Sequence, residues 1–154
     1  MKKYIDYMKT RLGVLQLTIK DDKLISIRYL TDQNENDIEP QYLKKTELIK
    51  EQLKEYLSGQ RKNITVPIKI EGSRLQKDVY TNLLGVKYGQ TISYKELAKR
   101  SGYPNAYRAV GTALSKNKIP IIIPCHRVIK SDGSIGKYTG GKWRKKMLLK
   151  IESS

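Results

Sequence analysis

Cysteine and histidine are almost absent from this 154-residue chain, which holds one of each, Cys125 and His126. A single cysteine cannot form an internal disulfide, and one cysteine with one histidine cannot supply the four ligands of a structural zinc site. The composition therefore excludes disulfide-rich and zinc-finger proteins, and we expect no metal ion and no other cofactor.

Long apolar runs are also missing. No stretch approaches the roughly 20 consecutive apolar residues that a membrane-spanning helix needs, and the acidic Asp6 comes before any apolar signal region could develop. We therefore expect a soluble, cytoplasmic protein with no membrane partner.

Acidic side chains are scarce in the second half of the chain. Residues 1–75 hold 15 lysines and arginines against 11 acidic residues, whereas residues 76–154 hold 16 against 4. A general preference for lysine would not deplete acidic residues from one half only. Together with the formal net charge of +16, this asymmetry predicts a polyanionic partner, with nucleic acid first and an anionic membrane surface second.

The start of the chain has the pattern of a small antiparallel sheet. Runs rich in β-branched and aromatic residues predict strands over 4–8, 12–20 and 23–29. Asp21-Asp22, between the last two runs, predicts a hairpin turn.

A loop and a helix are expected to follow. Residues 31–40 are polar and predict the loop, and apolar side chains at helical spacing from Tyr42 to Leu57 predict an amphipathic helix. Residues 64–70 contain Pro67 and are expected to form an edge strand. We place the domain boundary at this strand, with an N-terminal domain of residues 1–70 and a C-terminal domain of residues 71–154.

Short helices dominate the second half. Ser93-Tyr-Lys-Glu96 has the pattern of a capping box, which predicts a helix from Tyr94 to about Ser101. Residues 102–105 then predict a turn, and residues 106–116 a second helix. Two short helices joined by a glycine-containing turn are a helix-turn-helix signature, and the surrounding positive charge favours DNA binding.

The second of these helices is rich in small residues, including Ala109 and Gly111. Small residues permit close approach either to DNA or to neighbouring helices, and the sequence leaves both interpretations open. In total, the patterns predict an α/β protein, more narrowly an α+β fold. A small N-terminal antiparallel sheet plus helix is expected to pack on a mostly helical C-terminal domain with a helix-turn-helix.

The only cysteine and the only histidine are adjacent in the sequence. Residues 119–124 form an apolar run delimited by prolines, which predicts a strand that holds Cys125 rigidly. Nearby cations and a hydrogen-bonding histidine favour the reactive thiolate of a cysteine, and His126 and Arg127 follow directly. The alternative is that Cys125 is a small buried hydrophobic residue.

A histidine that acts as a base needs an acceptor that orients its ring. Residues 76–154 offer four carboxylates, at Asp78, Glu96, Asp132 and Glu152. Glu96 is assigned to the capping box and Asp132 to a Ser-Asp-Gly turn. We therefore prefer Glu152, while Asp78 stays open.

A glycine-rich loop, residues 131–141, carries hydroxyl groups and Tyr138. Such a loop can close over a flat ligand, with Tyr138 as a wall. It lacks the Gly-Lys-Ser/Thr ending of a phosphate-binding loop, which argues against nucleotide hydrolysis. A last helix is expected from about Lys142, with buried side chains at Met147, Leu148 and Ile151.

The chain resembles the O6-alkylguanine-DNA alkyltransferases, also called methylated-DNA–protein-cysteine methyltransferases. The resemblance rests on Pro124-Cys-His-Arg-Val128 and on Gly136-Lys-Tyr-Thr-Gly-Gly141. It covers about residues 73–152 and includes Arg108-Ala-Val-Gly111, Asn117, Ser93-Tyr94, Leu148-Leu149 and Glu152. The N-terminal third matches only in its order of strands and helix.

The resemblance implies direct repair of DNA. Cys125 would accept the alkyl group from O6-alkylguanine, and from O4-alkylthymine, in duplex DNA after the base has flipped out. A thioether is a poor leaving group and the chain has no second cysteine, so one turnover per molecule is expected. The partner would be double-stranded DNA bound by a monomer, with cooperative binding left open, and the protein would lie at the nucleoid.

The resemblance also implies roles for single residues. His126 would take the thiol proton through a water, Glu152 would orient His126, and Tyr94 would donate to the leaving guanine. Asn117 would tie the second helix to the active-site loop, and Arg108 would replace the extruded base. The guanine pocket would be lined by Val128, Tyr138 and Thr139. DNA contacts are expected at Tyr94, Lys95, Tyr103, Arg108, Ala109, Gly111, Ser115, Arg127 and Ser131.

Two departures from the family pattern and two rival functions stay in view. Lys118 stands where proline is common, and Ser115 stands where arginine is frequent, which removes one contact. The rivals are a DNA-binding regulator in which Cys125 is structural, and a cysteine hydrolase that uses Cys125, His126 and Glu152.

Overall fold

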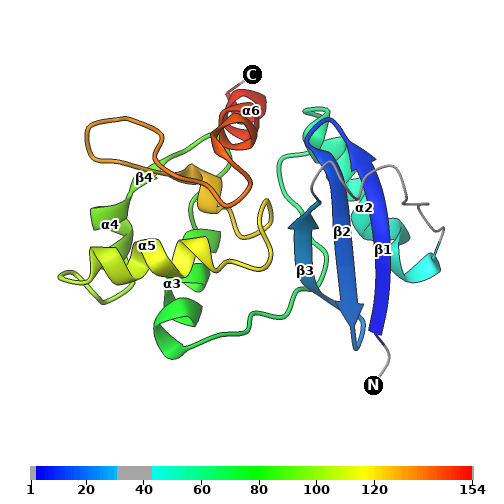
Figure 1. Ribbon diagram of the computed structural model, residues 1–154, viewed down its shortest axis with the longest axis horizontal. Helices are drawn as coiled ribbons and strands as arrows, with labels where there is room; N and C mark the ends of the chain where they lie inside the picture. The colour runs from blue at the N-terminus through cyan, green and yellow to red at the C-terminus, as the bar shows by residue number, and fades with distance from the viewer. Residues whose placement is uncertain (1–2, 31–42, 154) are drawn as a thin grey trace. The chain divides into compact units, whose positions relative to one another are not determined.

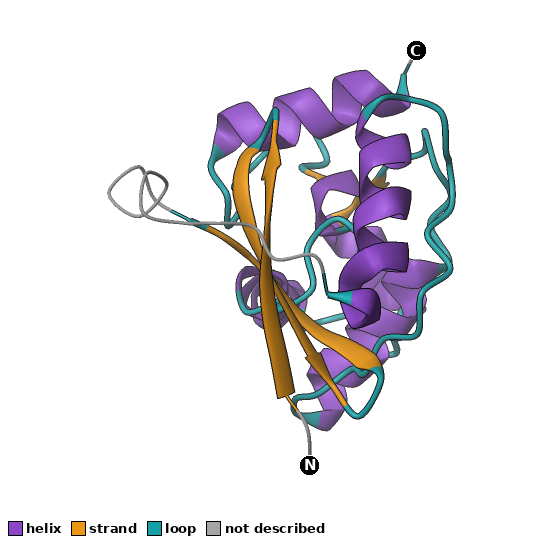
Figure 2. Cartoon of the chain, turned by 90° about the vertical axis from the view of Figure 1, so that its right-hand side faces the viewer, coloured by secondary structure: helices purple, strands orange, loops and turns teal. Residues whose placement is uncertain are grey.

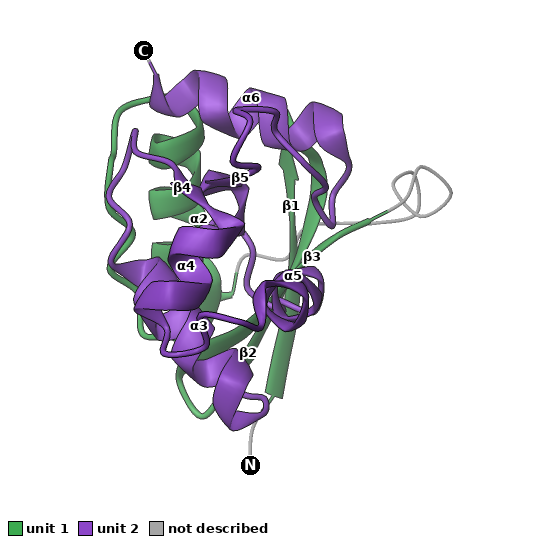
Figure 3. Cartoon of the chain, turned by 90° about the vertical axis from the view of Figure 1, so that its left-hand side faces the viewer, with its two compact units in different colours: residues 1–69 green, residues 70–154 purple. Residues whose placement is uncertain are grey.

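The chain folds into two compact units, residues 1–69 and residues 70–154 (Figures 1 and 3). The structure is a computed structural model that describes residues 3–30 and 43–153. The predicted loop at 31–40 and the predicted helical position Tyr42 lie outside the described residues. No helix in the described ranges is long and apolar enough to cross a membrane.

The first unit contains a three-stranded antiparallel sheet in the order β1-β2-β3, drawn in orange in Figure 2. Its strands are β1 (Lys3–Thr10), β2 (Gly13–Lys20) and β3 (Lys23–Tyr29). Lys20 pairs with Lys23 across the second hairpin, so the loop has two residues, Asp21 (φ 51°) and Asp22 (φ 63°). Aspartate tolerates the left-handed conformation that such a turn demands, and the predicted hairpin turn is confirmed.

Helix α2 (Lys44–Leu57) packs against β1 and β2. It buries Ile49, Leu53 and Tyr56, as its helical spacing predicts. Beneath it lies the fully buried carboxylate of Asp6, which accepts a 2.6 Å hydrogen bond from the Thr46 hydroxyl and pairs with Lys50 at 2.7 Å. These partners compensate the cost of burying a charge.

The prediction of an edge strand over residues 64–70 is wrong. Only one parallel bridge forms, between Leu24 and Ile68, with the Leu24 amide donating to the Pro67 carbonyl at 2.9 Å and the Lys69 amide to the Leu24 carbonyl at 3.0 Å. Pro67 has no amide hydrogen, so it cannot extend the bridge into a ladder.

The second unit contains four helices among its described residues: α3 (Arg74–Leu84), α4 (Tyr94–Arg100), α5 (Tyr107–Ser115) and α6 (Lys142–Glu152). Two short strands, β4 (Ile92–Ser93) and β5 (Val128–Ile129), pair in parallel, and β5 follows a 3₁₀ turn, η1 (Cys125–Arg127). α4 and α5 form the predicted helix-turn-helix, and both contact α3. Their shared core contains Val79, Leu83, Leu97 and Val110.

The helix starts differ from the prediction in one detail. The Ser93 hydroxyl accepts from the Glu96 amide at 3.1 Å, but the Glu96 carboxylate pairs with Arg100 at 3.2 Å on the next turn of the helix. The capping box predicted at α4 is therefore only half formed. A complete box stands instead at the start of α3, between Ser73 and Gln76.

Candidate active site

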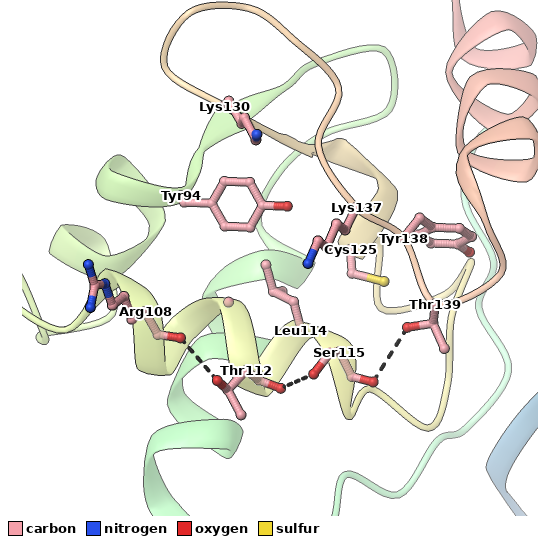
Figure 4. Close-up of a pocket in the computed structure, with 11 residues that line it drawn as sticks. Tyr94, Arg108, Thr112, Leu114, Ser115, Cys125, Lys130, Lys137, Tyr138 and Thr139 are labelled. Carbon is pink, nitrogen blue, oxygen red and sulfur yellow. Dashed lines mark hydrogen bonds between the residues drawn. The ribbon is translucent and has the colours of Figure 1, made fainter.

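A pocket of about 570 Å³ opens beside Cys125 in the second unit (Figure 4). Its wall comes from the start of α4, from one face of α5 and from the glycine-rich loop that precedes α6. The lining residues are Tyr94, Arg108, Gly111, Thr112, Leu114, Ser115, Cys125, Lys130, Lys137, Tyr138 and Thr139.

Cys125 is held by a turn, not by the strand predicted over residues 119–124. The Asn117 side chain organises this turn: its amide nitrogen donates to the Ile123 carbonyl at 2.9 Å, and its carbonyl oxygen accepts from the Ile119 amide at 3.0 Å. The Ile123 amide then donates back to the Ile119 carbonyl at 3.0 Å. Prolines at both ends of the run remove two amide donors that a strand would use, so a compact turn around a buried amide forms instead.

Asn117 is thus buried and connects the end of α5 to the segment that carries Cys125. This is the connection that the family resemblance implies for it. Burial raises the pKa of the Cys125 thiol to about 11, while a hydrogen bond from Asn117 and the charge of Lys145 act in the opposite direction. At neutral pH the thiol is therefore protonated and needs a base at the moment it reacts.

His126, Arg127 and Glu152 form one buried cluster. The Nε2 atom of His126 lies 2.7 Å from Glu152 Oε2, and both side chains are buried. Burial lowers the pKa of His126, although the Glu152 carboxylate opposes that shift. The imidazole is therefore neutral at pH 7, and a carboxylate holds its orientation.

Glu152 is the carboxylate at His126, and Asp78 is not. Asp78 accepts a 2.7 Å hydrogen bond from the Tyr103 hydroxyl, on the turn between α4 and α5. Tyr103, predicted as a DNA contact, is therefore also an anchor of this turn on α3.

Arg127 is the predicted DNA contact that the structure contradicts. Its guanidinium donates to both Glu152 oxygens at 2.9 Å and to the Val86 carbonyl at 2.6 Å, and only 8% of the residue is exposed. A buried carboxylate needs a paired cation, and the planar fork of arginine meets this need in two hydrogen bonds. Arg127 holds Glu152 in place, and its buried guanidinium is not accessible to DNA.

Val128 does not line the pocket, in contrast to the prediction. It is fully buried and pairs with Ile92 between β5 and β4. Its carbonyl accepts a 2.6 Å hydrogen bond from the amine of Lys145, which also donates to the Lys137 carbonyl at 3.2 Å. Val128 therefore supports the wall from behind.

Lys145 is the functional neighbour that the sequence analysis misses. It is fully buried, and burial lowers its pKa to about 8. The sequence predicts a buried side chain at Met147, but Met147 is only half-buried and Lys145 points inward instead. Helical periodicity around positions 148 and 151 places residue 145 on the buried face, so this spacing was the available signal.

Tyr94 lies over the pocket and close to the glycine-rich loop (Figure 4). Burial, and then the nearby Cys125, raise the pKa of its hydroxyl. Gly136 makes this packing possible: at its φ of +72°, an added Cβ would lie 2.9 Å from the Tyr94 hydroxyl.

One face of α5 forms the opposite wall. Arg108, Gly111 and Ser115, which the resemblance implies as DNA contacts, line the pocket, while Ala109 is exposed beside them. Thr112 shares this face by helical spacing and was missed. The Thr139 hydroxyl donates to the Ser115 carbonyl at 3.5 Å, which connects the loop to the helix (Figure 4).

The two remaining predicted DNA contacts lie outside the pocket. Lys95, on α4, places its amine 5.8 Å from the ring centre of Tyr107, at the start of α5. Ser131 is exposed in the loop. Both are accessible to a large ligand such as DNA.

Comparison with known families covers both units. Residues 74–154 match the family model described as 6-O-methylguanine DNA methyltransferase, DNA binding domain, and residues 3–70 match the ribonuclease-like domain of the same enzyme. The chain belongs to the 6-O-methylguanine DNA methyltransferase family.

Relatives and solved structures agree with this membership. The methylated-DNA–protein-cysteine methyltransferase of Methanosarcina barkeri is 36% identical over 154 residues, covering 98% of each chain. The inducible enzyme of Bacillus subtilis is 44% identical over 101 residues, which is 66% of this chain and 56% of that protein. The structure of Mycobacterium tuberculosis OGT in complex with DNA has a TM-score of 0.86 and 34% identity, covering 97% of this chain and 92% of that one.

The predicted family, the α+β fold and the enzyme class are therefore confirmed: this is a methyltransferase family of DNA repair whose acceptor is a protein cysteine. DNA binding is likewise confirmed as a property of the family. The roles of single residues stay predictions.

Proposed function

We propose that the protein repairs duplex DNA by moving the alkyl group of O6-alkylguanine to Cys125, once per molecule. The observation that carries this proposal is that the chain's only cysteine lines a pocket walled by the second helix of a helix-turn-helix. All residues of that wall lie between Tyr94 and Thr139, so we assign DNA binding and alkyl acceptance to the domain of residues 71–154.

The proton is proposed to leave Cys125 through His126. A neutral imidazole can accept a proton through a bridging water, and Glu152 stabilises the imidazolium that forms. Arg127 neutralises Glu152 in the resting protein, which is consistent with a carboxylate that orients the ring and does not itself take the proton.

The transfer is a single in-line displacement. The bond between the Cys125 sulfur and the alkyl carbon forms while the bond from that carbon to guanine O6 breaks. The electron pair passes to the guanine ring, which takes up one proton as it leaves, and His126 gives up the proton it received from Cys125, so the net change moves the thiol proton to guanine. The raised pKa of Tyr94 keeps its hydroxyl protonated at pH 7, so it can donate a hydrogen bond to the departing base.

Base flipping is part of the proposal. The O6 atom of a stacked guanine cannot reach a sulfur inside a pocket, so the nucleotide must leave the duplex, at a cost of a few kcal/mol. Arg108 lies at the pocket on the exposed face of α5 and would fill the gap in the stack. We also propose O4-alkylthymine as a substrate and a monomer as the active form at the nucleoid.

Intact-protein mass spectrometry tests this function. The protein is mixed at equal molarity with a duplex that carries one O6-methylguanine, and tandem spectra locate any adduct. We expect one added methyl on Cys125, saturating at one per protein and absent from Cys125→Ala. An unmodified protein that still binds the duplex would support the regulator instead, and repeated turnover would support the hydrolase.

Two extensions use the same measurement. A duplex with O4-methylthymine should methylate the same residue, and sedimentation with and without DNA reports the number of protein molecules per duplex. 2-Aminopurine placed beside the lesion should become fluorescent on binding if the base flips, and less so in Arg108→Ala.

A further inference from the structure

Three cationic side chains line the pocket, and none of its lining residues in the described part of the chain is acidic. Arg108 has a proposed role in base flipping. Lys130 directly follows β5 and Lys137 belongs to the glycine-rich loop, and the transfer of a methyl group requires neither of them. Their charges are therefore unexplained by the repair of a neutral adduct.

Lys137 is the better placed of the two. In Figure 4 its amine points into the pocket, between the Tyr94 ring and Cys125. Its backbone is anchored, because its carbonyl accepts a hydrogen bond from the buried amine of Lys145 at 3.2 Å. The side chain therefore starts from a defined position beside Tyr138, which lines the same pocket.

Lys130 lies immediately before the loop, next to β5, and has an acidic neighbour, Asp132. The Asp132 carboxylate accepts from the Ser134 amide and hydroxyl at 2.9 and 2.7 Å, and the charge of Lys130 helps to lower the Asp132 pKa. Part of the Lys130 charge is thus offset outside the pocket. Of the two lysines, Lys137 would therefore attract an anionic ligand in the pocket more strongly.

We propose that Lys137, assisted by Lys130, makes the pocket select O6-alkyl groups that carry a carboxylate over neutral groups of the same size. This inference rests on the proposed function and names the adduct class that the site favours. A carboxymethyl group on guanine O6 is the simplest member of that class.

The chemistry places the extra charge inside the pocket. In a carboxymethyl adduct the carboxylate is bonded to the carbon that the Cys125 sulfur attacks, so it must lie close to the sulfur. The sulfur–carbon bond forms, the bond from that carbon to O6 breaks, and the thiol proton ends on the released guanine. The carboxylate keeps its charge throughout, so a nearby ammonium stabilises both the bound adduct and the transition state.

A phosphate contact is the competing role for a lysine at a DNA-binding site. A phosphate lies on the nucleotide backbone and is the same whatever group sits on O6. Loss of a phosphate contact therefore slows the repair of every adduct by the same factor, whereas loss of a contact to the adduct slows only the repair of the anionic one. The comparison of two adducts in one duplex separates the two roles.

The experiment uses three duplexes of one sequence that carry O6-carboxymethylguanine, O6-carbamoylmethylguanine or O6-methylguanine. The carbamoylmethyl group is the neutral amide of nearly the same shape as the carboxylate. Second-order rate constants for transfer, at DNA concentrations well below saturation, are measured by intact mass for the wild type, for Lys137→Gln and for Lys130→Gln, because they report the transition state relative to the free protein and duplex. Lys142→Gln, an exposed lysine of α6 that does not line the pocket, is the matched control.

We expect Lys137→Gln to lower the ratio of the carboxymethyl rate to the carbamoylmethyl rate about fivefold, the size of effect that one partly exposed charge pair produces. Lys130→Gln should lower it less, and Lys142→Gln should leave it unchanged. Raising the salt concentration should reduce the ratio in the wild type, and less so in Lys137→Gln, where Lys130 still lines the pocket.

An unchanged ratio in Lys137→Gln, with both rates lowered equally, would overturn the inference and assign Lys137 to the DNA backbone. Methylation of Cys125 by the third duplex would in that case leave the proposed function standing. If none of the three adducts reaches Cys125, the proposed function itself fails, and this inference fails with it.

Discussion

Gly136→Ala isolates the contribution of one close approach to catalysis. The residue has a φ of +72°, and an added Cβ would lie 2.9 Å from the Tyr94 hydroxyl. Gly133, in the same loop, has a φ of +88° and would place a Cβ with nothing within 4 Å. Gly133→Ala therefore has the same left-handed backbone strain without the collision, and it is the matched control.

Backbone strain and displacement of the Tyr94 hydroxyl should have different effects on stability and on the rate of transfer. An L-residue in the left-handed conformation costs about 1–2 kcal/mol, so both variants should unfold at lower urea concentration by similar amounts. Only Gly136→Ala must move the Tyr94 hydroxyl by a few tenths of an ångström. Loss of a well-placed donor to developing charge costs about 10²-fold in rate, so a partial loss should slow transfer roughly tenfold.

Single-turnover methyl transfer at saturating O6-methylguanine duplex measures the effect, with urea unfolding of both variants alongside. Saturation removes any change in DNA affinity from the rate. Equal losses of rate in the two alanine variants would show that left-handed strain alone, and not displacement of the Tyr94 hydroxyl, slows the transfer. A normal rate in both would show that Tyr94 does not act through its hydroxyl.

Three further predictions follow from buried charges. Glu152→Gln leaves Arg127 buried without its anionic partner and should lower the free energy of unfolding by about 3 kcal/mol. Urea titrations at pH 7 measure this loss. The double variant Glu152→Gln/Arg127→Met should lose less free energy of unfolding than the two single variants lose in sum. His126 has a lowered pKa in the folded protein, so the unfolded chain binds more protons: stability is complete above about pH 6.5 and should fall below it by up to about 1.4 kcal/mol per pH unit. Urea unfolding at pH 7.5, 6.5 and 5.5 measures this slope, which should be shallower in His126→Asn. Asp6→Asn removes the partner of Lys50 in the first unit and should cost about 3 kcal/mol of stability, while the single-turnover rate of methyl transfer stays at the wild-type value; a loss of rate in the folded variant would contradict the assignment of catalysis to residues 71–154.

Local rules account for the features that could be predicted from the sequence. The hairpin at Asp21-Asp22 follows from residues that tolerate positive φ, and the start of α4 follows from the Ser93 hydroxyl. α5 is observed at Tyr107–Ser115, within one residue at each end of the predicted 106–116. The pairing of His126 with Glu152 could also be anticipated, because only four carboxylates stand in the second half of the chain.

Which charged side chains are buried depends on the folded chain. Arg127 and Lys145 are typical surface residues by composition, yet they satisfy Glu152 and the Val128 carbonyl inside the protein. Their partners lie 25 and 17 residues away along the chain, beyond the reach of any local pattern.

The turn before Cys125 is the other feature that depended on the folded chain. Apolar residues delimited by prolines suit a buried strand or a buried turn equally well, since burial reports hydrophobicity and not backbone geometry. The hydrogen bond from the Asn117 side-chain amide to the Ile123 carbonyl, six residues along the chain, stabilises the turn over the strand. The sequence thus determined the fold class, the partner class and the reactive pair. The packing determined how each polar group around that pair is satisfied, because a buried donor or acceptor finds its partner through three-dimensional contact.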